Sequence, residues 1–193
     1  MHNRILEMLI RRYDRRIMNN VQRGDYVECM IATTLGADWR LTSEKGWDWA
    51  AWDCEHTTSE ARLEIKQSTA RQSWDRETDR PRRNPGFDIR PRKGYWPNDG
   101  APWVTDPGRP ADIYIFAWHG KADEQADHRD ATQWRFFVVA EAFLPTGQKS
   151  VGLSRLERIA DPCSVGELKR AVENACPARE NLKAVRSGLV AGS

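Results

Sequence analysis

The 193-residue sequence lacks several features that would place it in a well-known class of proteins. Its four cysteines form no Cys-x-x-Cys pair, so a zinc cluster is not expected. It contains no glycine-rich phosphate-binding loop, no Gly-x-Ser-x-Gly element and no internal repeat. The sequence therefore gives no reason to expect a zinc module, a nucleotide-binding loop, a serine nucleophile of that kind or a repeat protein.

Long apolar runs are also missing, and none approaches the roughly 20 residues that a membrane-spanning helix needs. The first apolar pair, Leu9 and Ile10, is followed at once by Arg11 and Arg12, so the N-terminus does not resemble a signal peptide. We therefore expect a cytoplasmic protein with reduced thiols and no membrane partner.

Composition favours a single globular domain. Apolar residues make up 39% and charged residues 30% of the sequence, a balance typical of folded proteins. The formal net charge of +2 neither favours nor excludes a nucleic-acid partner. Within one domain of 1–193, we expect N-terminal helices in 1–36, core sheet and loops in 37–153, a C-terminal helix over 164–177 and a tail over 178–193.

Residues 61–68 alternate between small or apolar side chains and charged or polar ones. This period of two is typical of a half-buried strand. Leu63 and Ile65 then lie on one face, whereas Glu64 and Lys66 lie on the other, about 7 Å apart along the strand.

Asp53 ends a second short apolar run, residues 49–52. We expect this run to form the neighbouring strand of a hairpin, with residues 54–60 as its turn, so that Asp53, Glu64 and Lys66 converge. Two close carboxylates repel each other unless a cation lies between them, and Mg²⁺ prefers such oxygen ligands together with water and phosphate. A lysine beside them can orient water or neutralise charge that develops on a phosphate.

The spacing Asp53-x10-Glu64-Ile65-Lys66 resembles the motif of the restriction-endonuclease-like nucleases, the PD-(D/E)xK superfamily. In that family the aspartate ends one strand of a hairpin and the (D/E)xK triplet lies on the next. The chain departs from the pattern at Trp52, which stands where the family has proline. Asp48 is the alternative first aspartate, but the hairpin length between Asp53 and Glu64 favours Asp53.

The resemblance implies an α/β fold, namely a restriction-endonuclease-like sandwich with a central mixed β-sheet flanked by helices. It also implies that Mg²⁺, or Mn²⁺ in its place, is held by Asp53, Glu64 and the carbonyl of Ile65. Lys66 would then position or activate water. Many members carry a glutamate on the helix before the sheet, and Glu28 matches that position; an ordinary surface glutamate is the alternative.

Contacts with DNA are predicted after the motif. Gln67 or Gln72 matches the polar residue that many members place after the lysine to touch DNA. Residues 71–93 include eight basic and four acidic side chains. Arg71 and Arg76 are the basic residues of this segment nearest to the motif, and arginine suits phosphate contacts. A solubilising loop is the alternative.

Aromatic residues in one loop and a histidine after one strand are two further candidate features. The loop over residues 91–110 contains Tyr95, Trp96 and Trp103, which either stack on unpaired bases or pack over the sheet. His119 follows a hydrophobic strand, but no second histidine lies at ligand spacing, so no catalytic role is assigned to it.

The sequence thus predicts a metal-dependent nuclease that hydrolyses DNA phosphodiester bonds, with restriction, phage defence or repair as its setting. Residues 65–74, 109–118 and 133–149 resemble a group of uncharacterised stand-alone bacterial proteins. RNA is an alternative substrate, and a second copy of the chain or another protein is a candidate partner. Two other interpretations stay open: a catalytically silent nucleic-acid-binding or assembly module of the same fold, and an ordinary exposed strand pair.

Overall fold

The computed structural model describes residues 1–47, 49–76 and 79–176. Asp48, the alternative first aspartate of the motif, and the predicted tail lie outside the described residues. The described part forms four α-helices and seven β-strands: α1 (His2–Tyr13), α2 (Asn20–Leu35), β1 (Trp39–Leu41), β2 (Cys54–His56), β3 (Arg62–Thr69), β4 (Gly86–Asp88), β5 (Ile113–His119), β6 (Trp134–Ala140), β7 (Ser150–Gly152), α3 (Leu153–Ile159) and α4 (Leu168–Ala175).

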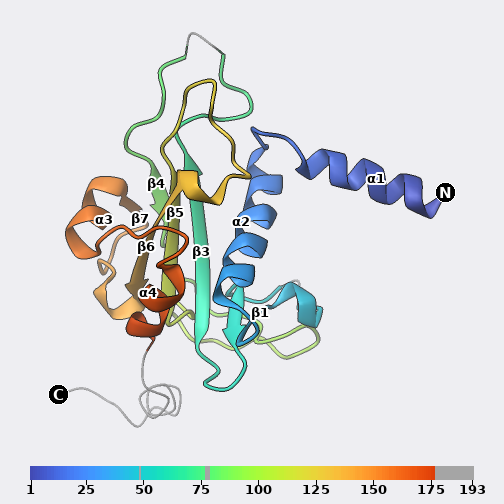
Figure 1. Cartoon of the computed structure of the whole chain (residues 1–193). Coiled ribbons are helices and arrows are strands. Elements are labelled where there is room, and N and C mark those ends of the chain that lie inside the picture. The colour runs from blue at the N-terminus through green and yellow to red at the C-terminus, as the bar shows by residue number, and fades with distance from the viewer. Residues whose placement is uncertain (48, 77–78, 177–193) are drawn as a thin grey trace.

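Five strands form the main sheet in the order β1-β2-β3-β5-β6, with the long strands β3 and β5 in its interior (Figure 1). β3 and β5 are parallel, whereas the other neighbouring pairs are antiparallel. Strands β4 and β7 pair with each other in a separate two-stranded sheet. The predicted α/β fold with a mixed sheet flanked by helices is therefore confirmed.

Two hydrophobic cores lie on opposite faces of this sheet, because successive side chains of a strand point to opposite sides. Helices α2 and α4 cover one face, where Val27 and Ile31 pack with Leu63 and Ile65. Helix α3 and the β4–β7 pair cover the other face, where Leu156 is fully buried. The predicted alternation of side chains along β3 is confirmed, with Glu64 and Lys66 on the second face. The strand is not half-buried as predicted, because that face is covered too and Glu64 is buried.

The hairpin before β3 differs from the prediction. Its first strand is β2, not residues 49–52, and Asp53 precedes this strand rather than ending one. The pairing places Cys54 opposite Leu63. Trp52 is buried in the second core, so a tertiary contact explains why the apolar run is not a strand.

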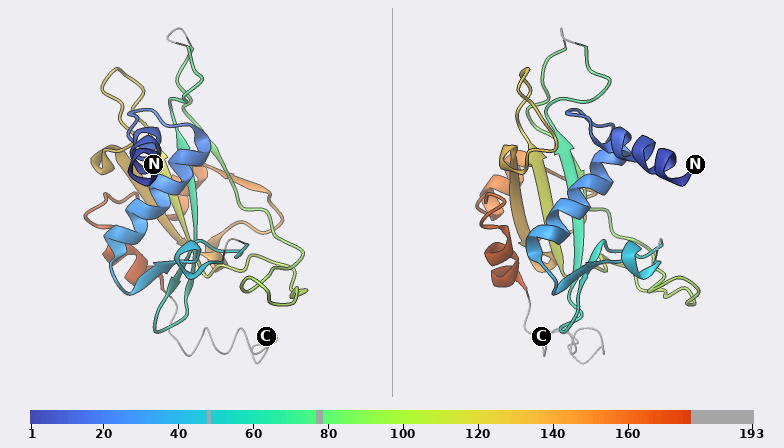
Figure 2. Two further views of the ribbon diagram at one scale, coloured as in Figure 1. Left: turned by 90° about the vertical axis from the view of Figure 1, so that its right-hand side faces the viewer. Right: turned by 45° about the vertical axis from the view of Figure 1, so that its right-hand side comes forward.

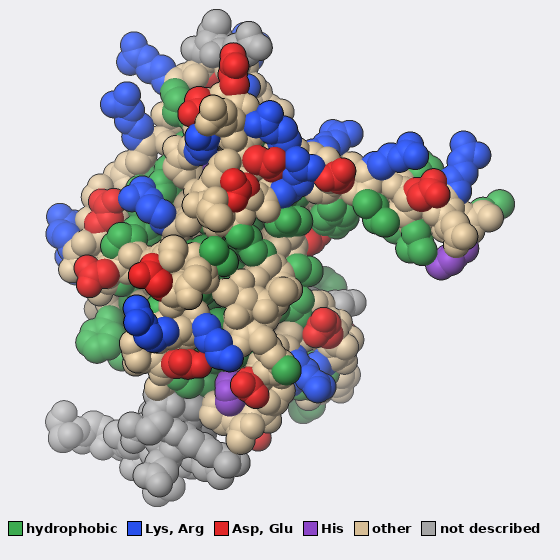
Figure 3. All heavy atoms as spheres, viewed as in Figure 1, with side chains coloured by type: hydrophobic (Ala, Val, Ile, Leu, Met, Phe, Trp, Pro, Cys, Tyr) green, Lys and Arg blue, Asp and Glu red, His purple; other side chains and the backbone are tan. Residues whose placement is uncertain are grey.

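Helix α1 projects from the body of the protein (Figures 1 and 2). It ends at Tyr13, and none of its residues is buried. Apolar side chains lie along one side of it and basic ones along the other (Figure 3). Within the described part of the chain, no helix is both long enough and apolar enough to cross a bilayer.

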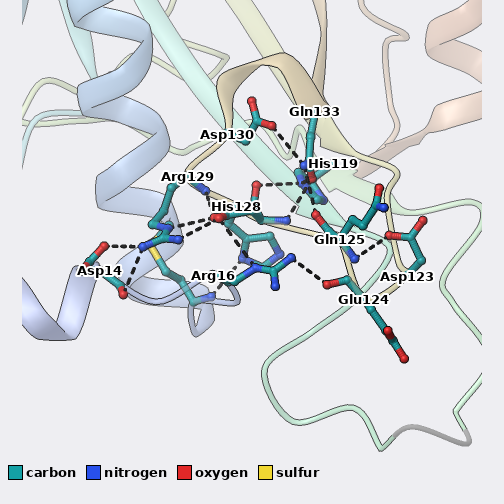
Figure 4. A network of polar contacts seen from close by, with 12 residues as sticks. Asp14, Arg16, His119, Asp123, Glu124, Gln125, His128, Arg129, Asp130 and Gln133 are labelled. Atoms are coloured by element: carbon teal, nitrogen blue, oxygen red, sulfur yellow. Dashed lines mark hydrogen bonds and ion pairs between the residues drawn. The ribbon is translucent and has the colours of Figure 1, made fainter.

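The loop between β5 and β6 ties the N-terminal segment to the sheet (Figure 4). The backbone N–H of Met18 donates to Nδ1 of His128 at 3.0 Å, and the N–H of His128 donates to the carbonyl of Arg16 at 2.7 Å. The guanidinium of Arg129 forms an ion pair with Asp14. These contacts fix where α2 begins relative to the sheet.

His119 is fully buried at the end of β5 and belongs to the same network. Its Nε2 lies 3.1 Å from Oε1 of Gln133, and its ring packs edge-on against His128 with a centroid separation of 5.0 Å. Burial lowers the pKa of both imidazoles, that of His128 to about 3. Both imidazoles are therefore neutral at neutral pH, and their contacts are structural.

Candidate active site

Glu64 and Lys66 lie side by side on β3 at the wall of a cavity of about 390 Å³. Only 4% of Glu64 is exposed, and its Oε1 accepts a hydrogen bond from Nζ of Lys66. The guanidinium of Arg92 lies 3.6 Å from the same oxygen. A buried carboxylate needs such partners, because desolvation strongly penalises an unpaired charge.

The cavity carries more positive than negative charge. Lys66, Arg90 and Arg92 line it on the basic side, against Glu64 and Asp88 on the acidic side. Lys66 is only partly buried, with 28% of its side chain exposed, so its ammonium can reach a ligand that enters the cavity. The basic side of the cavity therefore suits an anion such as a phosphate.

Asp53 lies against β3 where the pairing with β2 stops. Oδ2 of Asp53 accepts a hydrogen bond of 2.6 Å from the backbone N–H of Ile65. The carboxylate thus takes the place of a missing strand neighbour for the residue between Glu64 and Lys66. Burial, followed by repulsion from Glu64 and Glu28, raises the pKa of Asp53 well above its ordinary value. Asp53 itself does not line the cavity.

Glu28 lies on α2 and adds a third carboxylate to this cluster. Its pKa is raised to about 7, first by burial and then by repulsion from Asp25 and Glu64, whereas Lys66 acts in the opposite direction. The predicted Glu28, Asp53 and Glu64 are therefore close enough to influence one another's ionisation. We refer to these three residues together as the carboxylate cluster.

Among the described residues, no group of three or more His, Cys, Asp or Glu side chains has the arrangement of a metal site. Mg²⁺ does not require one, since it often takes one or two carboxylates and completes its shell with water and phosphate. Carboxylates whose mutual repulsion raises their pKa also gain stability from a nearby cation. Burial and repulsion within the cluster raise the pKa of Asp53 and of Glu28, and a cation bound beside these two carboxylates would relieve the repulsion.

The two glutamines predicted to touch DNA form hydrogen bonds within the protein instead. Oε1 of Gln67 accepts a 2.6 Å hydrogen bond from Nε of Arg23, and its Nε2 donates to the carbonyl of Asn20 at 3.3 Å. Gln67 thereby joins β3 to α2. Gln72 is buried, and its Nε2 donates to the carbonyl of Thr69. Neither glutamine lines the cavity beside Lys66.

Arg71 and Arg76 lie together at another small cavity, of about 140 Å³. Arg71 is half-buried and donates to the carbonyl of Ala122, whereas Arg76 is exposed. A role in DNA binding stays a prediction for both.

Sequence reasoning did not single out Arg92 and Tyr114. Arg92 was one of many basic residues, and only the fold brings it against Glu64. Tyr114 lies directly opposite Glu64 in the parallel β3–β5 pair and lines the cavity. Burial, together with the charge of Glu64, raises the pKa of Tyr114 and keeps its hydroxyl protonated. Only the register of a parallel sheet would have revealed this neighbour.

Comparisons with models of known protein families, with curated proteins and with solved structures give no match. The function must therefore be inferred from the chemistry of the carboxylate cluster and of the cavity beside it.

Proposed function

We propose that the protein is a metal-dependent nuclease that hydrolyses DNA phosphodiester bonds, with Asp53, Glu64 and Lys66 as its catalytic residues. The observation that carries the proposal is the hydrogen bond from Ile65 to Asp53. It joins the aspartate of the predicted motif to the strand that carries Glu64 and Lys66. The position of α2 and the mixed sheet also support the restriction-endonuclease-like sandwich that the motif implies.

Asp53 and Glu64 would hold Mg²⁺ or Mn²⁺, together with the carbonyl of Ile65 and with Glu28 as an additional carboxylate. Such an ion, when bound, lowers the pKa of water and polarises the phosphate. Release of the Glu64–Lys66 ion pair would leave the Lys66 ammonium able to orient the attacking water or to donate to a phosphate oxygen. Arg90 and Arg92 would hold the phosphate backbone at the cavity.

The alternative function is a catalytically silent binding or assembly module of the same fold. One observation favours it, namely the exposed apolar side chains of α1, such as Ile5 and Ile10, which are 50% and 65% exposed. The nuclease is favoured by the buried Glu64, which is paired with Lys66 and Arg92 beside a cavity, because a catalytically silent module does not require this arrangement.

Cleavage assays test the proposal. Purified protein is incubated with supercoiled, linear and single-stranded DNA and with RNA, in Mg²⁺, Mn²⁺ or EDTA. We expect metal-dependent cleavage that falls at least a hundredfold in Lys66→Ala, since electrostatic groups at a reacting centre typically contribute about 10²–10³ in rate. Lys149→Ala removes an exposed lysine outside the cavity and should retain full activity.

Thermal unfolding of each variant shows whether it is folded. Equal cleavage by wild type and Lys66→Ala would refute the role of Lys66. Tight DNA binding by a folded wild type that cleaves no substrate would favour the silent module instead.

A further inference from the structure

Three exposed tryptophans lie on two neighbouring loops. Trp49 belongs to the loop after β1, and Trp96 and Trp103 belong to the loop after β4. Trp49 is 73% exposed, and Trp96 and Trp103 are each 44% exposed. Trp49 and Trp96 line a hollow of about 440 Å³ together with Asn98 and Asp99. Gly100 and Ala101 complete the lining, and we call this hollow the tryptophan slot. Large exposed aromatic side chains around a concave surface usually mark a binding site.

A backbone bridge and a hydrogen bond join the two loops that form the slot. Trp96 forms a β-bridge with Ala50, and the N–H of Trp49 donates to Oδ1 of Asp99 at 3.3 Å. In both views of Figure 2 the loop after β1 and the loop after β4 lie side by side here. Two segments far apart in sequence therefore present the two indoles as a preformed pair.

Trp103 supports Trp96 from behind. Their rings lie 4.5 Å apart at an angle of 70°, an edge-on contact. Trp103 in turn packs directly on Gly94, where an added Cβ would lie 2.8 Å from its ring and 2.3 Å from the carbonyl of Val104. Only glycine permits this approach, so the local sequence fixes the orientation of Trp96.

Tyr95 and Trp96 are neighbours in this loop, but they have different surroundings. Its ring packs edge-on against the buried Trp52 and faces the guanidinium of Arg62. Tyr95 thus packs over the sheet, one of the two predicted alternatives. Trp96, the next residue, points its ring into the slot.

The slot is connected to the cavity of Glu64 and Lys66 by one short segment. Arg92 contacts Glu64 at the cavity, and Trp96 lies four residues further on, about 13 Å away if the segment is extended. Arg92 and Lys93 are the basic residues of this segment, and a strand of nucleic acid along it would meet positive charge before it reaches the rings.

We propose that the tryptophan slot binds an unpaired nucleobase of the DNA strand whose backbone lies at Lys66, so that the substrate is single-stranded or frayed DNA. This inference rests on the proposed function. Stacking on an indole accepts any base, and the amide of Asn98 can bond to its polar edge. Bases inside an intact duplex present no free face to the rings, so a fully paired substrate cannot use the slot.

Binding measured without cleavage tests the slot. Full-length protein in EDTA is titrated into a fluorescein-labelled oligothymidylate, an abasic strand of the same length and a blunt duplex, followed by anisotropy. We expect wild type to bind oligothymidylate at least tenfold more tightly than the abasic strand. Trp96→Ala should weaken oligothymidylate binding about tenfold and leave abasic binding unchanged. Trp96→Phe should retain most of the affinity.

Phe143→Ala is the control, because Phe143 is also an exposed aromatic residue, 73% exposed against 44% for Trp96, and it lies beyond the opposite edge of the sheet. It should bind every strand as wild type does. Equal affinity of wild type for oligothymidylate and the abasic strand, or equal losses in Trp96→Ala and Phe143→Ala, would overturn the inference. Full displacement of oligothymidylate by tetramethylammonium at unchanged ionic strength would also overturn it, since the slot would then be an aromatic cage for cations.

The two proposals fail separately. DNA cleavage by wild type with no effect of Trp96→Ala on binding would refute the slot and leave the nuclease. Base-dependent binding that Trp96→Ala abolishes, in a protein that cleaves nothing, would refute the nuclease and support the slot as a site for unpaired bases.

Discussion

Replacement of Glu28 by glutamine should stabilise the metal-free protein at neutral pH. In the folded chain the pKa of Glu28 is raised from 4.5 to about 7, whereas in the unfolded chain it returns to its ordinary value. The contribution of Glu28 to stability is therefore fully present below pH 4.5 and is lost as the pH rises through about 7. Glutamine resembles the protonated carboxyl group but does not titrate.

The magnitude follows from this span of about 2.5 pH units, at about 1.4 kcal/mol for each unit. Because Glu28 is only partly buried, we expect the variant to gain about 2–3 kcal/mol in free energy of unfolding above pH 7, and to differ little in its pH dependence below pH 4.5. Asp53 titrates in both proteins, so the difference between them reports Glu28 and its repulsion with Asp53.

Urea denaturation in EDTA, repeated across this pH range, measures the difference. A saturating concentration of Mg²⁺ should reduce it, since a bound cation stabilises the ionised cluster of the wild type. A difference that does not change with pH would refute the reasoning, because it would show that neither burial nor the neighbouring carboxylates raise the pKa of Glu28 in the folded chain.

Other predictions concern buried groups away from the cluster. The pKa of His128 is lowered by burial to about 3, so the unfolded chain takes up a proton first, and stability from this residue falls by about 1.4 kcal/mol per unit as the pH drops from 6.5 toward 3. His128→Asn should flatten the decline in urea denaturation over this range; an unchanged slope would contradict the burial of a neutral ring. Cys54 is buried with a raised pKa, whereas Cys29 is exposed. A thiol reagent should therefore label Cys29 in the folded protein and Cys54 only after unfolding, as mass spectrometry of peptides can show; early labelling of Cys54 would contradict the packing of β2.

The periodic spacing of apolar residues in the sequence predicted the helices and strands whose side chains follow that period. The alternation around Glu64 predicted which side chains of β3 share a face, although both faces are covered. The expected N-terminal helices include α2, whose Val27, Ile31 and Leu35 are buried at helical spacing. The place of Asp53 beside Ile65 also followed from the length of the hairpin, although the strand itself lies one residue after Asp53 rather than before it.

The remaining features depend on contacts between distant segments. Trp52 was assigned to a strand because its packing with Tyr95, far along the chain, leaves no local signal. The ion pair of Arg92 with Glu64 likewise needs the whole crossover between β3 and β5. Helix α3 was not predicted, because its seven residues present too short an apolar stripe for the helical period to stand out.

Joint binding of a divalent ion by Asp53 and Glu64 is the central claim, and a titration with Mn²⁺ tests it most directly. Electron paramagnetic resonance of the free ion counts the bound ions at millimolar concentration, with no need to know the substrate. We predict one Mn²⁺ per chain in wild type, an affinity at least tenfold weaker in Asp53→Asn and in Glu64→Gln, and no change in Glu157→Gln, which alters an exposed residue of α3. Folded wild type that binds no Mn²⁺, or binding that both cluster variants leave intact, would contradict the account.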